Sequence, residues 1–291
     1  ETAQDPQQLV AKWSHTLVVR NTDHQPESPD DGTVILTSSV RNQYQTNGYV
    51  DNTVVNGTPY YYGVFAISTA GVPSASAFAS ATPIAGTPLA QLAEGTLIKI
   101  LENGSPVEFY LAKHNYEPDL NGQGRELLVR KDVYDQRQWS TASYEYNSWT
   151  RSTILSWLNC EYKSLFSSSV QSLMGRTKYY LTPGGFDRDV TTGNAAVFLL
   201  SGTELGESAE HLNTEGSILP IADTLQICFQ DGAASTQWTR SPQVNGQLYV
   251  YYNQSNGKIT YTSASSVNGS RPCFTLPSTS LVDSGLNLID E

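Results

Sequence analysis

The sequence predicts a mainly β protein with an α+β part, and two observations carry that prediction. Only 15% of the 291 residues are charged, whereas tyrosine is abundant at 17 residues, which favours short strands and polar turns over long charged helices. Short β-branched and aromatic runs also recur along the chain, separated by turn-forming residues. A chain of this length is typical of two domains.

Residues 1–86 are predicted to form the first domain, a small β-sandwich. Its β-rich runs are HTLVVR (15–20), TVILT (33–37) and YYYGVFAIS (60–68). In the third run, strand alternation separates the side chains of Tyr60, Val64 and Ala66 from those of Gly63 and Phe65, and one of the two sets should belong to a core. PIAGTPLAQ (83–91) is rich in proline and small residues, which predicts a short linker.

NGTPYYYGVFAISTAG, followed by SASAFASATP, resembles the last strands of a fibronectin type III domain. The resemblance implies an immunoglobulin-like sandwich in which the hydroxyl of Tyr60 ties back to nearby backbone. It also implies that this copy is incomplete, because the family would already have passed through two strands at the position of the Asp5-Pro6 dipeptide. An exposed sheet edge is the expected consequence.

Residues 87–291 are predicted to form the second domain, which contains the α+β part. GTLIKILENGSPVEFYLAKHNY predicts a hairpin that turns at ENGSP, and the strand GRELLVR follows. NSWTRSTILSWLNCEYKSLF is the best helix candidate, with Asn147 or Ser148 as its cap, and SSSVQSLMGRT predicts a second helical piece. Strands and loops are expected again from residue 197 onward.

The order of these signals resembles a domain family of unknown function found in surface and prophage proteins of Gram-positive gut bacteria. STILSWLN (152–159), VFLLSGTELG (197–206), TQWTRSP (236–242) and NGSRPCFTLP (268–277) carry the resemblance. It implies a fold related to C-type lectins and to formylglycine-generating enzymes. Together with a fibronectin-like module, it implies a structural protein of a phage or prophage, located in the virion tail or at a cell surface.

Residues 243–270 have the composition of a binding surface. They contain four tyrosines and many small polar residues but one charged side chain, Lys258. Tyrosine offers a stiff amphipathic contact area, while serine, glycine and asparagine offer adaptable hydrogen bonds, as in antibody paratopes. Alternation predicts that Leu248, Val250 and Tyr252 face inward, and Asn256-Gly257 predicts the turn. The predicted ligand-binding residues are Gln243, Asn245, Gln247, Tyr249, Tyr251, Asn253, Tyr261, Ser263 and Ser265.

Two further interpretations of this segment follow from its position and composition. Some lectin-fold proteins of phages are diversified by retroelements that randomise adenine-containing codons near the C-terminus, which enriches asparagine, tyrosine and serine. The resemblance implies that residues 243–270 are such a variable segment. A solvated antiparallel strand pair with polar turns would have the same composition, so a structural segment without a ligand stays open as the alternative.

No known catalytic or metal-binding motif stands out in the sequence. His15, His24, His114 and His211 are scattered, and the chain has no GxSxG elbow, P-loop or HExxH motif. The EPD tripeptide (117–119) lies too early for the calcium loop of sugar-binding lectins. The acidic stretch 204–215 is expected to be a solvated face; a Ca²⁺-binding loop stays open as the alternative, although the stretch lacks the spaced DxDxDG pattern. The three cysteines have no zinc spacing and are expected to be buried hydrophobes. We expect no enzyme activity, cofactor or metal.

The charge narrows the partners. The formal net charge of −11 and the lack of a Lys/Arg run argue against nucleic acid and against anionic membranes. No apolar run is long enough to span a bilayer, and ETAQDPQQ does not have the pattern of a signal peptide. We expect a non-catalytic phage tail or prophage receptor-binding protein that recognises a bacterial surface protein or glycan. A bacterial adhesin or glycan-binding module and a purely structural virion module are the alternatives.

Overall fold

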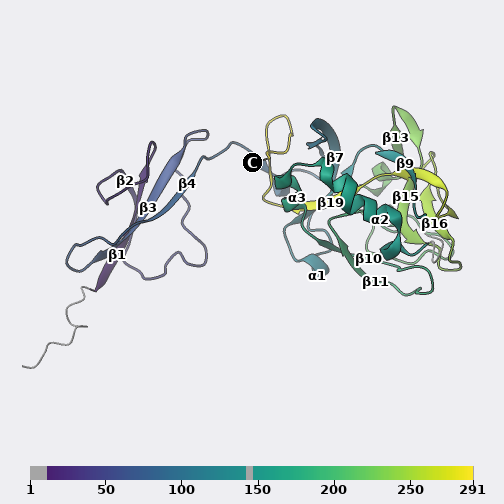
Figure 1. Cartoon of the computed structure of the whole chain (residues 1–291), viewed down its shortest axis with the longest axis horizontal. Coiled ribbons are helices and arrows are strands. Elements are labelled where there is room, and N and C mark those ends of the chain that lie inside the picture. Colours follow the sequence, from purple (N-terminus) through teal and green to yellow (C-terminus); the bar gives the residue numbers. More distant parts are fainter. Residues whose placement is uncertain (1–11, 142–146, 291) are drawn as a thin grey trace, which may run out of the picture. The chain divides into compact units, whose positions relative to one another are not determined.

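The computed structural model describes residues 12–141 and 147–290, so the predicted break at Asp5-Pro6 lies outside the described residues. The chain divides into two compact units, Glu1–Ala85 and Gly86–Glu291 (Figure 1). Strands make up 39% of the structure and helices 12%, so the protein is mainly β. Among the described residues, no helix is both long and apolar enough to cross a lipid bilayer.

The N-terminal unit is built on one antiparallel sheet with the strand order β2-β1-β3-β4. The strands are β1 (Trp13–Asn21), β2 (Thr33–Ser38), β3 (Tyr60–Ser68) and β4 (Ala77–Ala81). The first three contain the three β-rich runs read from the sequence. All five residues of β4 are exposed, and β4 lies at an edge of the sheet. The described residues therefore contain one sheet of this unit.

A small core lies on one face of this sheet. Val19, Phe65 and Ile67 are buried together, with Leu17 packed against them. On the opposite face of β3, Val64 is 39% exposed, and Ala66 is exposed as well. Of the two side-chain sets in YYYGVFAIS, the one that contains Phe65 is thus the more deeply buried.

Tyr60 closes the loop that precedes β3. Its ring is buried, and its hydroxyl accepts a hydrogen bond from the Val55 N–H at 3.0 Å. The Arg20 guanidinium lies over the same ring, 4.8 Å from the centroid. The predicted tie from this tyrosine to nearby backbone is confirmed. It fixes the start of β3 against the loop that precedes it.

Replacing Tyr60 by phenylalanine should loosen the N-terminal unit while leaving its packing intact. The ring would stay, but the Val55 N–H would lose its acceptor, at a cost of about 0.5–1.5 kcal/mol. Hydrogen exchange of the β3 amides would report the change. Tyr61→Phe, on the neighbouring position, is the control and should leave exchange unchanged; equal effects of the two substitutions would contradict the role assigned to the Tyr60 hydroxyl.

The C-terminal unit is organised around an antiparallel five-stranded sheet with the order β12-β19-β8-β7-β6. Its strands are β6 (Leu97–Glu102), β7 (Ser105–Lys113), β8 (Arg125–Arg130), β12 (Val197–Phe198) and β19 (Cys273–Pro277). β6 and β7 form the predicted hairpin, in which Asn103 and Gly104 have φ angles of 51° and 76°. Positive φ at both turn positions suits an Asn-Gly hairpin, which is why ENGSP turns there.

Short helices pack beside this sheet. They are η2 (Leu89–Gln91), α1 (Pro118–Asn121), η3 (Trp149–Arg151), α2 (Thr153–Trp157), η4 (Leu158–Tyr162), η5 (Lys163–Leu165), α3 (Ser168–Met174) and α4 (Ala222–Leu225). The long helix predicted over 147–166 is thus divided into consecutive short turns. Ser152, rather than Asn147 or Ser148, caps α2, because its hydroxyl accepts the Leu155 N–H at 3.2 Å. The predicted second helix corresponds to α3.

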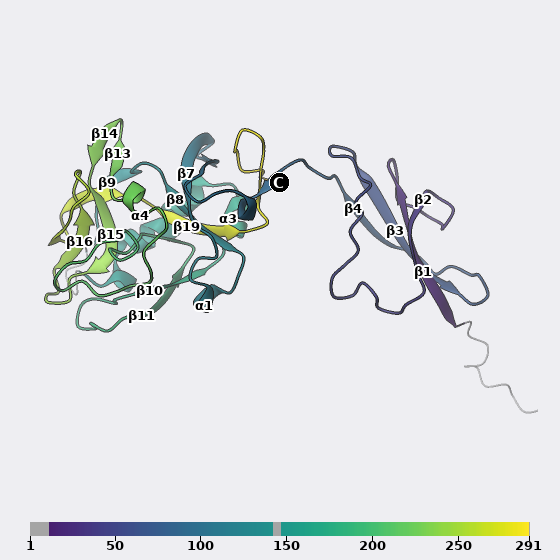
Figure 2. The same ribbon diagram turned by 180° about the vertical axis from the view of Figure 1, so that it is seen from behind.

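The remaining strands form small sheets at the margins of this unit. They are β5 (Thr87–Pro88), β9 (Asp135–Gln138), β10 (Thr177–Leu181), β11 (Thr191–Ala195), β13 (Cys228–Gln230), β14 (Ala233–Ser235), β15 (Gln237–Pro242), β16 (Tyr249–Asn253), β17 (Ile259–Ser263), β18 (Val267–Ser270) and β20 (Leu281–Val282). Figures 1 and 2 both place β15 and β16 at the end of this unit opposite to α3 and the C-terminus.

The predicted extent of the linker and the predicted burial of all three cysteines are each wrong in part. Thr87–Pro88 pairs with β20, and Leu89 is fully buried, so the second half of the predicted linker 83–91 belongs to the C-terminal unit. The cysteines are free, and Cys228 and Cys273 are buried as expected, but Cys160 is exposed. It lies on η4, on the side of the helical segment that faces solvent. Its apolar neighbours in the sequence therefore do not bury it.

Candidate functional site

The tyrosine-rich segment forms a hairpin at the end of the C-terminal unit. β15, β16 and β17 make a three-stranded antiparallel sheet, and Tyr249 pairs with Ser263 while Tyr251 pairs with Tyr261. The strands turn at residues 254–258, where Gly257 has a φ of 83° and supplies the positive angle that the turn needs. We call residues 249–263 the tyrosine hairpin. The turn includes Asn256-Gly257, as the sequence predicts.

Three tyrosine rings lie in a row across this hairpin. Tyr261 is in the middle, with its ring centroid 5.5 Å from Tyr249 and 5.9 Å from Tyr251, both in edge-to-face geometry. Tyr249 is 41% exposed and Tyr261 is 48% exposed, whereas Tyr251 is buried. Edge-to-face pairs are worth about 0.5–1.5 kcal/mol beyond their burial. The row therefore holds two exposed rings against a buried third.

The structure divides the predicted ligand-binding residues into two groups. Those with exposed or partly exposed side chains are Asn245, Gln247, Tyr249, Tyr261, Ser263 and Ser265. Gln243, Tyr251 and Asn253 are buried, at 7%, 1% and 0% exposure, so the expectation that they form part of a solvent-facing surface is wrong. Leu248 is a further correction, because it is 43% exposed where alternation placed it inside.

The loop before residue 215 explains the burial of Tyr251 and Asn253. The Tyr251 hydroxyl donates a hydrogen bond to the Glu210 carbonyl, and Asn253 Nδ2 donates to Glu207 Oε1 at 3.2 Å. Asn253 Nδ2 also lies 3.2 Å from the Gly257 carbonyl, which ties the strand to its own turn. Strand alternation describes a sheet with one wet face, and here a loop from elsewhere in the chain covers that face of β16.

Burial raises the pKa of Tyr251 to about 12, and the neighbouring Tyr261 and Glu210 add to this effect. Because the neutral phenol is favoured in the folded state, its contribution to stability is complete below pH 10 and is lost as the pH rises to about 12. We expect the hairpin to loosen in that window. Ultraviolet titration of tyrosine should show a late-ionising phenol that disappears in Tyr251→Phe; an unchanged titration curve would contradict this assignment.

Asn147 holds the backbone at the start of the tyrosine hairpin. The sequence indicates it only as a candidate helix cap and does not predict this supporting role. Its side chain is fully buried, and Nδ2 donates to the carbonyls of Gly246 at 2.8 Å and Tyr249 at 3.1 Å. A third carbonyl, that of Gln243, lies at 3.3 Å, while Oδ1 accepts the Gly185 N–H at 2.8 Å. An asparagine ahead of a helical pattern signals a cap, and nothing local in the sequence indicates these distant partners.

Arg240 of β15 is at the centre of a buried charge network. Arg240 and Glu204 are both fully buried, and Arg240 Nη1 lies 2.6 Å from Glu204 Oε2. Arg240 also donates to the carbonyls of Tyr180 and Leu199, each at 2.9 Å. Burial alone would lower the pKa of Arg240, but Glu204 outweighs this and raises it, so the guanidinium stays charged.

Trp238 and Arg271 also make structural contacts. Trp238 is 2% exposed and donates from its indole to the Arg137 carbonyl at 2.9 Å. Arg271 is 2% exposed and donates to the carbonyls of Arg130 and Leu225, each at 2.7 Å. These contacts make Trp238 and Arg271 part of the scaffold of the C-terminal unit.

The acidic stretch 204–215 is a solvated face only in part. Glu210 is exposed, but Glu204 and Glu215 are fully buried, which corrects the expectation for both. Glu215 accepts hydrogen bonds from the Thr182 N–H at 2.7 Å and from the Ser241 hydroxyl at 2.6 Å, while burial raises its pKa. Within residues 12–141 and 147–290, no group of three histidine, cysteine or acidic side chains is placed to hold a metal ion.

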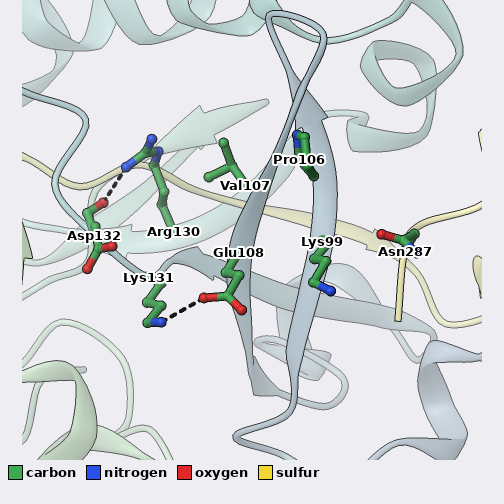
Figure 3. Close-up of a pocket in the computed structure, with 8 residues that line it drawn as sticks. All are labelled: Lys99, Pro106, Val107, Glu108, Arg130, Lys131, Asp132 and Asn287. Atoms are coloured by element: carbon green, nitrogen blue, oxygen red, sulfur yellow. Dashed lines mark hydrogen bonds and ion pairs between the residues drawn. The ribbon is translucent and has the colours of Figure 1, made fainter. Parts of the chain in front are cut away.

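A hollow of about 520 Å³ lies on the outer face of β6, β7 and the end of β8 (Figure 3). Lys131 points toward Glu108, with 2.6 Å between Nζ and Oε2, and Arg130 donates to the Asp132 carbonyl at 2.8 Å. Arg130 is also paired with Glu102 at 3.0 Å. The lining thus contains the basic groups of Lys99, Arg130 and Lys131 and the acidic groups of Glu108 and Asp132.

Comparison with known families places most of the C-terminal unit. A family model described as Domain of unknown function (DUF6273) matches residues 123–278, more than half of the chain. The chain belongs to this family. The DUF6273 match includes the tyrosine hairpin, the Arg240 network and Asn147, together with the four stretches that carried the resemblance in the sequence. Searches of curated proteins and of solved structures returned no match.

Proposed function

We propose that this protein is a non-catalytic binding protein, a phage tail or prophage-encoded receptor-binding component, and that the tyrosine hairpin contacts a bacterial surface protein or glycan. The observation that carries the proposal is the pair of exposed rings, Tyr249 and Tyr261, held edge to face, with the buried Tyr251 ring also edge to face against Tyr261. Exposed aromatic rings on a stiff frame lose little conformational entropy on binding. That combination suits recognition rather than chemistry.

The surroundings of the two rings supply adaptable polar contacts. Asn245 and Gln247 precede β16, and the hydroxyls of Ser263 and Ser265 lie 2.8 Å from one another on the returning side. Asn245 Nδ2 lies 3.4 Å from His211 Nε2, which brings the neighbouring loop to the same surface. The predicted ligand-binding set is therefore narrowed to its six exposed or partly exposed members, and the buried members act as support.

The proposal extends to the finer fold assignments. One antiparallel sheet with a hydroxyl tie at Tyr60 supports a fibronectin type III-like N-terminal unit that serves as a spacer. The compact arrangement of short helices around antiparallel sheets supports a C-type-lectin-like C-terminal unit. Within the C-terminal unit, strand β16 of the hairpin lies at the end opposite to α3 (Figure 2).

We further propose that residues 243–270 are a diversified segment, and the structure refines where variation can be tolerated. Substitution should concentrate at the six exposed or partly exposed positions, since Val250 and Asn253 are fully buried and would disturb the core. The nucleotide sequence of the region tests this: a nearby template copy should differ only at adenines, within codons of the exposed residues. Differences spread equally over buried and exposed codons would contradict the proposal.

Replacing Tyr249 and Tyr261 together by serine should reduce binding by at least about tenfold, because two central aromatic contacts would be lost. The full chain would be tested by pull-down with whole Gram-positive gut bacteria and on a glycan array. Phe78→Ser is the matched control, since Phe78 is 47% exposed on the N-terminal unit and should not affect binding. Equal binding by the double variant, or no binding by the unaltered protein to any cell or glycan, would overturn the proposal.

A further inference from the structure

A second hollow of the C-terminal unit joins two segments that lie far apart in the sequence. A cleft of about 670 Å³ is lined by residues 113–115 and the EPD tripeptide 117–119, by Tyr180 of β10, and by Thr214, Gly216 and Ser217. Val190 also contributes to its lining. The tyrosine hairpin contributes none of the lining residues, so the cleft is separate from the proposed receptor-binding surface.

One wall of the cleft is anchored to the core at several points. Tyr116 is fully buried, and its hydroxyl donates to Glu204 Oε1 at 2.5 Å. Asn121 exchanges two hydrogen bonds with the backbone of Lys178, at 2.9 and 2.8 Å, which ties α1 to β10. Asn115 and Glu117, on either side of Tyr116, have left-handed φ angles of 50° and 43°. Asparagine adopts such angles readily, whereas glutamate holds them only where its surroundings impose them.

The facing wall is also held in place by hydrogen bonds. The Glu215 carbonyl accepts the Ser201 hydroxyl at 2.8 Å, and Ser217 Oγ accepts from Lys113 Nζ at 2.7 Å. Between them, Gly216 has a φ of 88°, and a Cβ at this position would lie 3.2 Å from Glu117 Oε1. Glycine therefore avoids a side chain that would crowd the Glu117 carboxylate, which lines the cleft. A cleft with both walls anchored is already formed before a ligand arrives.

The charges of the cleft favour a cation. Glu117 and Asp119 contribute two carboxylates, against the single ammonium of Lys113, which lies 3.4 Å from Glu117 Oε1. His114 does not change this balance, because its Nδ1 lies 2.5 Å from the buried Glu126 carboxylate. Tyr180, Pro118 and Val190 add apolar surface beside these groups. The net charge of −11 also attracts cations to the protein as a whole.

We propose that this cleft binds a small organic cation, a protonated primary amine on an apolar body. Its ammonium would lie against Asp119 and the free oxygen of Glu117, and its apolar part would pack on the Tyr180 ring and Val190. An ammonium supplies the donors that two carboxylates lack, and an aliphatic body matches the apolar wall. This site goes beyond the proposed receptor-binding function and does not depend on it.

Titration of the full-length protein with n-pentylamine, followed by amide chemical shifts, tests this site. The amides of Gly216 and Ser217 should shift and saturate with the amine, whereas n-pentanol, the neutral ligand of the same length, should have little effect. Asp119→Asn should weaken binding roughly tenfold, the factor that corresponds to about 1.4 kcal/mol. Glu161→Gln, at an exposed carboxylate elsewhere in the same unit, should leave it unchanged.

Three outcomes would overturn the proposal. They are equal shifts with n-pentanol, amine-induced shifts as large around Glu161 as around Gly216, and unchanged binding by Asp119→Asn. Glu117→Gln is a second variant, and it should weaken the amine as well. Asp119 is exposed, so its substitution decides the question even if the change at the nearly buried Glu117 disturbs folding.

Discussion

Replacing Arg240 by alanine is expected to destabilise the C-terminal unit by about 3–5 kcal/mol, the range found when one partner of a buried ion pair is removed. The Glu204 carboxylate would remain buried without its cation, and the carbonyls of Tyr180 and Leu199 would lose their donor. Glu215 nearby is also buried and would no longer have the guanidinium to offset its charge.

Denaturant unfolding, with the tryptophan fluorescence of the C-terminal unit as the signal, would measure this loss. Four of the five tryptophans lie in that unit, and two of them, Trp139 and Trp149, are fully buried. The fifth is Trp13, in the N-terminal unit. Lys131→Ala is the control, because its pair with Glu108 is more than one-third exposed on both sides and should cost less than about 1 kcal/mol. A loss of under 1 kcal/mol for Arg240→Ala would mean that Glu204 finds other partners or takes up a proton.

Local chemistry accounts for what could be predicted from the sequence. The β6–β7 hairpin follows from Asn103-Gly104, and the turn of the tyrosine hairpin follows from Gly257, because few other residues adopt positive φ. The β-rich runs became strands because their β-branched and aromatic residues suit a pleated surface.

What could not be predicted depends on contacts between distant segments. Tyr251 and Asn253 lie on the face of β16 that alternation assigned to solvent, and a loop more than 35 residues upstream covers them. Cys160 was expected to be buried because its neighbours in the sequence are apolar, but its helical segment presents this position to solvent. The cleft at Glu117 combines segments from both halves of the unit, and neither segment shows it alone. Periodicity within one strand contains no information about such partners.

Asn147→Ala should loosen the tyrosine hairpin, with an expected loss of about 2–4 kcal/mol from several buried hydrogen bonds of about 1 kcal/mol each. The amide of Asn147 bridges the backbone before β16 to Gly185, so its removal leaves carbonyls of Gly246 and Tyr249 without this donor. Binding through Tyr249 and Tyr261 should fall with it, because the exposed rings would no longer be held in one arrangement.

Asn159→Ala provides a matched comparison for that effect. Asn159 makes the same kind of bridge elsewhere, donating to the carbonyls of Leu155 and Val197 and accepting the Ala196 N–H. Both variants should lower global stability by similar amounts, but only Asn147→Ala should speed hydrogen exchange selectively across residues 249–263 and weaken cell or glycan binding. If exchange in the hairpin rises equally in the two variants, Asn147 contributes to stability alone, and the preorganisation of the tyrosine surface must come from the ring row itself.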